Sequence, residues 1–250
     1  MAFYKDRDNI IIGLRPVMEA IKKEVILDKV MVAKGMEHRQ WEELRGYFFD
    51  YQIPYKVVPR EKLDSLTPKN HQGVVAFISP IPFYDAELVI SRLINEGKSP
   101  LVLLADGVTD MRNFGGIVRT AEGAGVDIIL LPFRDNVAIN DDAVKTSAGA
   151  LLHVPIAKVF NLTKIITFIK EMGFQVVVCQ ENAKLDYNEI DYTGPTLLVV
   201  GAEDTGISSE VYQAATHEIK IPMQGTISSL NVSVATGIIC FEAVKQRTKI

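Results

Sequence analysis

The chain has 250 residues, of which 48% are hydrophobic and 23% charged, so it can bury a full core, and we expect two domains. No apolar run reaches membrane-spanning length and the first residues lack the apolar stretch of a signal peptide, so we expect a cytoplasmic protein without a membrane anchor. The net charge is -4, with 13 Lys+Arg against 11 Asp+Glu in residues 1–80 and 14 against 20 in the remainder. The net charge therefore does not require a nucleic-acid partner. If RNA or DNA is bound, we expect the contacts to be local and to lie first of all in residues 1–80.

The two cysteines predict neither a disulfide nor a metal site. Cys179 and Cys240 each stand in an apolar stretch with no second thiol nearby in sequence, which is typical of reduced core residues. The four histidines are scattered and make no ligand pattern. We therefore expect no metal.

The first eighty residues have the pattern of a small α/β unit. In the stretch 38–50, Trp41, Leu44 and Phe48 recur at three-and-four spacing, which predicts a helix. Pro80, Pro82 and an acidic segment after them predict a linker over residues 81–99. The other elements expected in this unit are a short approach into a helix (10–14 and 17–21), strands at 28–34, 54–58 and 74–79, and a helix at 60–66.

Two tripeptides in this unit place donor-bearing side chains beside a glycine at an element boundary. They are Gly13-Leu14-Arg15 and His71-Gln72-Gly73. Ordinary turn chemistry explains each in isolation, whereas the functional interpretation is that Arg15, His71 and Gln72 contact phosphates or bases of a folded RNA.

From Pro100 onward, apolar strands alternate regularly with helices, which predicts a parallel sheet covered by helices on both faces. We expect strands at 101–105, 127–131, 154–159, 175–179, 196–201 and 219–221, and helices at 114–124, 141–150, 162–172 and 229–245. In the last helix Ser229 is the expected N-cap, which leaves Asn231 as a weak helix former inside the first turn.

Ligands of such a sheet bind beyond the carboxyl ends of its strands, so the segments after Ala105, Gly201 and Ile221 carry most interest. The glycine fingerprint of dinucleotide binding is absent after the first strand, which argues against a nucleotide-dependent oxidoreductase. Glu203 and Asp204 could form a capped turn and Arg119 a surface salt bridge. Polar side chains at three strand ends agree better with one shared site.

Three ordered motifs carry a resemblance to a known family. They are Asn113-Phe-Gly-Gly-Ile-Val-Arg119-Thr, then Val-Val-Gly201-Ala-Glu203-Asp-Thr-Gly, then Ile221-Pro-Met-Gln-Gly followed by Ser228-Ser229-Leu-Asn231-Val-Ser-Val-Ala. In this order they resemble the SpoU (TrmH) family of RNA ribose 2′-O-methyltransferases, within the SPOUT superfamily. The first eighty residues look like the substrate domain of the RlmB branch, which has the fold of ribosomal protein L30e and methylates a guanosine in 23S ribosomal RNA.

The resemblance implies a separate role for each domain, and it implies a cofactor. Residues 1–80 would bind RNA and residues 100–250 would form the methyltransferase domain, whose sheet the family folds into a trefoil knot, although physics alone favours unknotted connections. Members of the family work as homodimers. Gly201, Ile221, Met223 and Leu230 would hold S-adenosylmethionine, largely through backbone groups.

The resemblance also implies that Arg119, Asn113, Glu203, Ser229 and Asn231 line the catalytic site. A guanidinium has a pKa above about 12, so Arg119 suits a clamp on a phosphate and on the developing alkoxide better than a general base. Asn113, Ser229 and Asn231 can position the ribose or the methionine part, and Glu203 can orient Arg119.

Two alternatives stay open beside methylation of a 23S ribosomal guanosine. One is a transfer-RNA 2′-O-ribose methyltransferase. The other is a non-catalytic RNA-binding protein of the same fold.

Overall fold

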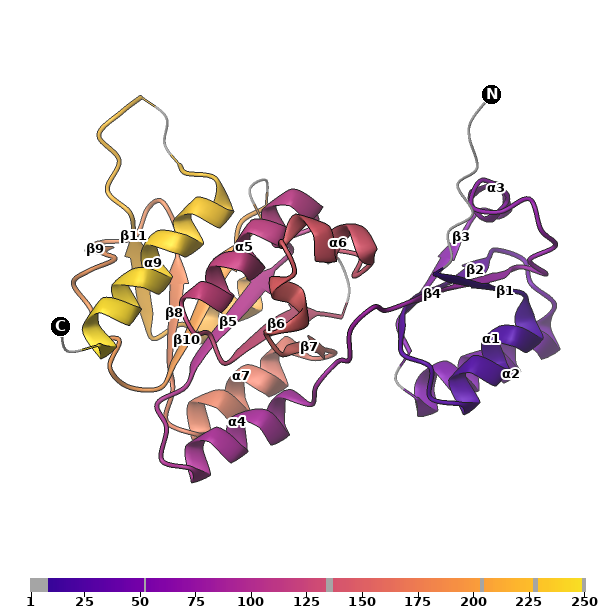
Figure 1. The fold of residues 1–250 in the computed structure, drawn as a ribbon, viewed down its shortest axis with the longest axis horizontal. Helices are drawn as coiled ribbons and strands as arrows, with labels where there is room; N and C mark the ends of the chain where they lie inside the picture. Colours follow the sequence, from indigo (N-terminus) through magenta and orange to yellow (C-terminus); the bar gives the residue numbers. More distant parts are fainter. Residues whose placement is uncertain (1–8, 52, 134–136, 203–204, 227–228, 249–250) are drawn as a thin grey trace. The chain divides into compact units, whose positions relative to one another are not determined.

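The computed structural model describes residues 9–51, 53–133, 137–202, 205–226 and 229–248. The chain divides into two compact units, Met1–Pro82 with Ala138–Asn140, and Phe83–Val137 with Asp141–Ile250 (Figure 1).

The first unit contains a four-stranded mixed sheet of order β1-β4-β2-β3, in which β2 and β3 are parallel and β4 runs antiparallel to both β1 and β2. Helices α1 and α2 pack on one face of the sheet around Ile21, Leu44 and Phe48, and α3 packs on the other through Leu63. The elements are β1 (Ile10–Ile12), α1 (Leu14–Lys22), β2 (Leu27–Ala33), α2 (His38–Asp50), β3 (Tyr55–Val58), α3 (Arg60–Asp64) and β4 (Val74–Ile78).

The start of this unit differs from the sequence expectation. Residues 10–12 form a strand rather than an approach into a helix, because they pair with β4 across the register Ile10 to Phe77. Gly13, at a φ of 101°, turns the chain from this strand into α1. The segment Ala138–Asn140 also belongs to this unit, and the buried Ile139 donates its N–H to Asp28 Oδ1 at 3.2 Å.

The second unit contains a seven-stranded, all-parallel sheet of order β7-β6-β5-β10-β8-β11-β9, so the predicted α/β class with a parallel C-terminal sheet is confirmed. Its elements are α4 (Ala86–Asn95), β5 (Leu101–Asp106), α5 (Met111–Gly123), β6 (Ile128–Pro132), α6 (Asp141–Thr146), the 3₁₀ turn η1 (Ala150–Leu152), β7 (Ile156–Val159), α7 (Leu162–Glu171), β8 (Gln175–Cys179), β9 (Leu185–Asp186), β10 (Thr196–Gly201), α8 (Ser209–Ala214), β11 (His217–Lys220) and α9 (Val232–Arg247).

Helices cover both faces of this sheet, as continuous apolar strands require. Figure 1 shows α4 and α7 on one face and α5, α6 and α9 on the other. The core beneath α4 and α7 includes Ile90, Leu104, Ile165 and Ile169, each 5% exposed or less.

The expected linker over residues 81–99 is wrong for its central part, where α4 forms. Asp85 caps this helix by accepting a hydrogen bond from the N–H of Leu88 at 3.0 Å. Ile90 and Leu93 are buried, and Ile90 joins the core of the second unit. The acidic residues that suggested a linker therefore lie in the capped first turn of an amphipathic helix.

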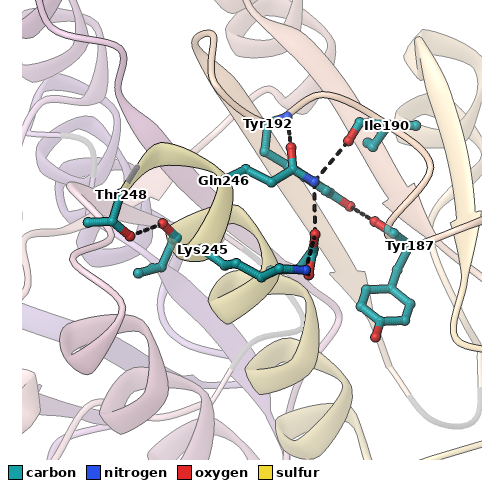
Figure 2. A network of polar contacts seen from close by, with 8 residues as sticks. Tyr187, Ile190, Tyr192, Lys245, Gln246 and Thr248 are labelled. Atoms are coloured by element: carbon teal, nitrogen blue, oxygen red, sulfur yellow. Dashed lines mark hydrogen bonds and ion pairs between the residues drawn. The ribbon is translucent and has the colours of Figure 1, made fainter. Parts of the chain in front are cut away.

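The C-terminal end of α9 is fastened to the loop before β10 by polar contacts (Figure 2). Gln246 accepts the N–H of Tyr192 at 3.0 Å and donates to the carbonyl of Ile190 at 3.2 Å. The guanidinium of Arg247 donates to three carbonyls at 2.7–2.8 Å, those of Ser99, Tyr192 and Gly194. These contacts fix the orientation of α9, and with it the position of the N-terminal end of the helix.

No helix among the described residues is long and apolar enough to cross a membrane.

Candidate functional site

A pocket of about 560 Å³ opens beyond the carboxyl ends of β8, β10 and β11 and beside the start of α9. Its position agrees with the rule that parallel sheets bind ligands at their carboxyl edge, and its volume suits a ligand of nucleoside size. The pocket is lined by Cys179, Gln180, Glu181, Asn182, Val200, Gly201, Ala202, Gly206, Ile207, Ile221, Met223, Ser229, Leu230, Asn231, Val232 and Ala235. All four residues expected to hold the cofactor are in this set.

Gly201 shapes one wall of the pocket. A Cβ atom there would lie 2.5 Å from the carbonyl carbon and oxygen of Gly206, closer than real Cβ atoms come to backbone. Ala202 and Gly206 close the turn that follows by exchanging N–H to carbonyl hydrogen bonds of 3.1 and 2.9 Å. Only glycine permits this approach. Glu203, the expected partner of Arg119, lies outside the described residues.

Asn231 joins the third motif to the first. It is the N-cap of α9, because its Oδ1 accepts the N–H of Ser233 at 3.0 Å and the Ser233 hydroxyl at 2.6 Å. Its Nδ2 donates to Asn113 Oδ1, in the first turn of α5, at 2.8 Å. Two amide side chains that are 118 residues apart in the sequence are thus held together at the rim of the pocket.

The expected start of the last helix at Ser229 is therefore wrong. The helix begins at Val232, and Ser229 is an exposed residue that lines the pocket. Asparagine is unfavourable inside the first turn of a helix and favourable as an N-cap. The N-cap lies two residues later than expected, at Asn231, and this explains why an asparagine stands there.

Two adjacent glycines let α5 approach its neighbours. A Cβ at Gly115 would lie 2.7 Å from Thr146 of α6, and one at Gly116 would lie 2.8 Å from Cβ of Ser233 of α9. Asp110 caps α5 by accepting from the N–H groups of Arg112 and Asn113, both at 2.9 Å. The first motif therefore fixes α5 against the helix whose start borders the pocket.

Arg119 lies on α5 two turns beyond its start and is exposed. In the part of the chain that the structure describes, it is not among the residues that line the pocket. The pocket and Arg119 are thus separate features of one chain, connected by the packing of α5 on α9.

The loop after β8 also borders the pocket, and sequence reasoning missed it. Gln180 Nε2 donates to Glu218 Oε2 at 2.8 Å and to the Tyr212 hydroxyl at 3.3 Å. Burial raises the pKa of the neighbouring Cys179 thiol to about 11, which keeps this pocket residue neutral. No motif marks this loop, and its position after the predicted parallel strand at 175–179 is the signal that could have found it.

Asp106, at the end of β5, links the first and second motifs. It is 6% exposed, and its Oδ2 accepts the N–H of Ser208, which precedes α8, at 2.7 Å. The loops that follow β5 and β10 are thereby held together.

In the first unit, the two tripeptides singled out from the sequence lie beside each other. The N–H of Gly13 donates to the carbonyl of Val74 at 3.0 Å, and Gln72 Oε1 lies 3.4 Å from the position of a Gly13 Cβ. Arg15 and Gln72 are both exposed.

The imidazole of His71 is 3% exposed, which corrects its expected role as an RNA contact. Its Nδ1 accepts a hydrogen bond from the N–H of Gly73 at 2.9 Å, and its Nε2 is 2.9 Å from Asp64 Oδ1. Since Nδ1 accepts, the Nε2 nitrogen carries the proton and donates to the carboxylate. His71 therefore holds the loop that presents Gln72.

Among the described residues, no three His, Cys, Asp or Glu side chains are grouped so that they could hold a metal ion.

Comparisons with known proteins identify both units. The SpoU rRNA Methylase family matches residues 100–241, and the family described as RNA 2′-O ribose methyltransferase substrate binding matches residues 10–84. A Staphylococcus haemolyticus (strain JCSC1435) protein assigned to the TrmH family of tRNA/rRNA methyltransferases is 35% identical over 244 residues, which cover 97% of this chain and 98% of the relative.

Solved structures agree. The AdoMet-bound rRNA methyltransferase from Sinorhizobium meliloti has a TM-score of 0.59 at 26% identity, covering 94% of this chain and 86% of that one. The TrmH/SpoU tRNA modifying enzyme of A. aeolicus has a TM-score of 0.55 at 38% identity, covering 64% of this chain and 83% of that one. The chain therefore belongs to the SpoU (TrmH) family of S-adenosylmethionine-dependent RNA 2′-O-ribose methyltransferases.

Proposed function

We propose that the chain methylates the ribose 2′-hydroxyl of a guanosine in 23S ribosomal RNA. The observation that carries the proposal is the Asn231–Asn113 hydrogen bond, which joins two motifs at the rim of a pocket of nucleoside size. A ribosomal substrate is supported by the name of the matched family and by the rRNA methyltransferase of S. meliloti. The alternative is transfer RNA, which the name of the A. aeolicus enzyme favours.

The second unit would carry the chemistry and the first unit would bind the RNA. S-adenosylmethionine supplies the methyl group as an electrophile on its sulfonium. Gly201, Ile221, Met223 and Leu230 would hold it, because all four line the pocket and Gly201 lets the backbone of Gly206 close one wall.

Arg119 would bind the phosphate beside the reacting ribose and stabilise the negative charge that develops on the 2′-oxygen. Its exposure on α5 suits contact with a large polyanion. Asn113, Ser229 and Asn231 would orient the ribose and the methionine part by hydrogen bonds, since two of these side chains are already fixed to one another. Glu203 would orient Arg119 through a bidentate pair.

The chain would act as a homodimer through the exposed face of α9. Val234 and Phe241 lie seven residues apart, two helical turns, and are 51% and 50% exposed. A helix that is apolar on its buried side and also carries large apolar residues on its exposed side is typical of an interface. Phe241 lies beside α5, since its ring is 3.9 Å from the position of a Gly123 Cβ. A second copy on this face would lie close to α5, the helix of Arg119.

In the first unit Arg15 and Gln72 would contact the RNA, because the start of α1, which carries Arg15, lies beside the loop that carries Gln72 and both side chains are exposed. Their joint replacement by alanine in the full chain should raise the KM for RNA and leave cofactor affinity unchanged. We also propose that the reaction takes place in the cytoplasm.

The test is methyl transfer by the purified full chain from radiolabelled S-adenosylmethionine to deproteinised 23S ribosomal RNA and, separately, to bulk transfer RNA. The product is digested to nucleosides and analysed by mass spectrometry. We expect 2′-O-methylguanosine from the ribosomal RNA. Incorporation into transfer RNA alone would replace the proposed substrate, and absence of transfer to either RNA would contradict the enzyme activity.

A further inference from the structure

An aromatic pair lies at the carboxyl ends of the two outermost strands on one side of the large sheet. Phe133 directly follows β6 and Phe160 directly follows β7, and their ring centroids are 3.6 Å apart with an angle of 34° between the planes. The N–H of Phe133 donates to the carbonyl of Val159 at 2.7 Å, which fixes the backbones of the two residues relative to each other. Phe160 is nonetheless 50% exposed.

A cation lies on the edge strand that Phe160 directly follows. Lys158 lies two residues before Phe160, and side chains two apart on an extended chain point to the same side. Its Nζ lies 4.4 Å from the centroid of the Phe83 ring. The N–H of Tyr84 donates to the carbonyl of Ile156 at 2.9 Å, so this part of the chain runs along the edge strand β7. Phe83 and Lys158 therefore add an aromatic ring and a positive charge to the edge strand that Phe160 follows.

The pair lies on the same edge of the sheet as the candidate site. Strands β5, β6 and β7 are consecutive neighbours in the sheet, with Leu104 in register with Leu130 and Pro132 in register with Val159. The order β7-β6-β5-β10 puts three strand spacings of about 4.8 Å, roughly 14 Å, between the end of β7 and the end of β10, which borders the pocket. The N–H of Val137 also donates to the carbonyl of Val108, in the loop that leads into α5, at 3.1 Å.

We propose that Phe160, backed by Phe133, is a stacking platform for an unpaired nucleobase of the RNA substrate, close in the strand to the ribose that is methylated. Proteins that bind single-stranded RNA present aromatic rings beside basic groups, because every base offers a π-face and every linkage a negative charge. The exposed ring of Phe160 offers the π-face, and Lys158, two residues before it on the edge strand, brings a positive charge to this edge of the sheet. The proposal rests on the proposed RNA methylation and adds a base contact, supplied by the methyltransferase unit, to those expected of the first unit.

The test compares Phe160→Ala and Phe160→Tyr with the wild-type full chain. Leu152→Ala is the matched control, because Leu152 is 59% exposed in the same unit and belongs to the 3₁₀ turn η1 rather than to the aromatic surface. Binding is measured with a twelve-nucleotide single-stranded RNA that carries 2-aminopurine, whose fluorescence falls on stacking, in the presence of S-adenosylhomocysteine. Methyl transfer to 23S ribosomal RNA is measured in parallel.

Phe160→Ala should weaken RNA binding and raise the KM for RNA by about 10- to 100-fold, the loss expected for one base stack. It should also abolish the fluorescence quenching and leave S-adenosylhomocysteine affinity unchanged, while Phe160→Tyr and Leu152→Ala should behave like the wild type. Equal quenching and KM in Phe160→Ala and wild type would overturn the platform, as would loss of quenching in Leu152→Ala. Wild-type quenching without methyl transfer to any RNA would contradict the proposed function and leave the platform supported.

Discussion

The substitution Gly201→Ala tests the construction of the cofactor pocket. The added Cβ would lie 2.5 Å from the carbonyl carbon and oxygen of Gly206 and 2.8 Å from the amide nitrogen of Ile207. All three are backbone atoms, so no side-chain rotation relieves the contact. Since ordinary contacts between carbon atoms are about 3.5–4.0 Å, the backbone after Gly206 must move by roughly 1 Å.

That displacement falls on a wall of the pocket, because Gly201, Gly206 and Ile207 all line it. We expect overpacking to cost about 1–3 kcal/mol of stability. The displaced backbone groups should also weaken S-adenosylhomocysteine affinity, and every 1.4 kcal/mol of binding free energy lost lowers it about tenfold.

Isothermal titration calorimetry with S-adenosylhomocysteine measures the affinity, and thermal unfolding confirms that the variant is folded. The matched control is Gly194→Ala, because a Cβ at Gly194 meets nothing within 4 Å. Near wild-type affinity in Gly201→Ala would refute the assignment of this wall to the cofactor.

Three further predictions concern charge, titration and the end of α9. Arg119→Ala should lower single-turnover methyl transfer by on the order of 10²–10³-fold with cofactor affinity unchanged, and Arg119→Lys should recover little, because an ammonium lacks the planar fork; near-normal transfer would remove Arg119 from the site. Burial raises the pKa of the Cys179 thiol to about 11 and that of Cys240 to about 12. The neutral thiols therefore contribute to the free energy of unfolding. This contribution is complete below the ordinary thiol pKa of about 8.5 and is lost as the pH rises through the pKa values of the folded state. Thermal unfolding should show a fall in stability above about pH 9 that is smaller in Cys240→Ala, and an identical fall would contradict this cause. Arg247→Ala should cost roughly 2–4 kcal/mol in denaturant unfolding, because three carbonyls lose a charged donor; a change below about 0.5 kcal/mol would show that water replaces it.

Periodicity and strand-end chemistry predicted most of the large sheet. The apolar runs at 175–179 and 196–201 have the predicted bounds, because buried parallel strands are apolar along their whole length. The helix at 38–50 was also predicted with its observed bounds, since Leu44 and Phe48 mark its buried face. S-adenosylmethionine as cofactor was implied by the motifs rather than by periodicity, and the comparisons confirm it.

The errors have physical causes that a local sequence pattern does not show. Residues 10–12 form a strand because they pair with β4. This partner lies more than sixty residues further along the chain, so no local pattern reveals it. Helix α4 was hidden by neighbouring prolines and acidic residues, one of which, Asp85, is its cap. The expected RNA contact of His71 is wrong because tertiary packing, which the sequence does not show, buries its side chain. The trefoil knot, the homodimer and the roles of the catalytic residues stay predictions.

The most direct test of the central claim is a map of ribose 2′-O-methylation across all 23S ribosomal and transfer RNA, in cells with and without this protein. We predict that one 2′-O-methylguanosine in 23S ribosomal RNA disappears without the protein, returns with the wild-type chain and does not return with Arg119→Ala. Loss of a transfer-RNA methyl group instead would contradict the ribosomal substrate. Unchanged maps in both RNA classes would contradict the methyltransferase itself.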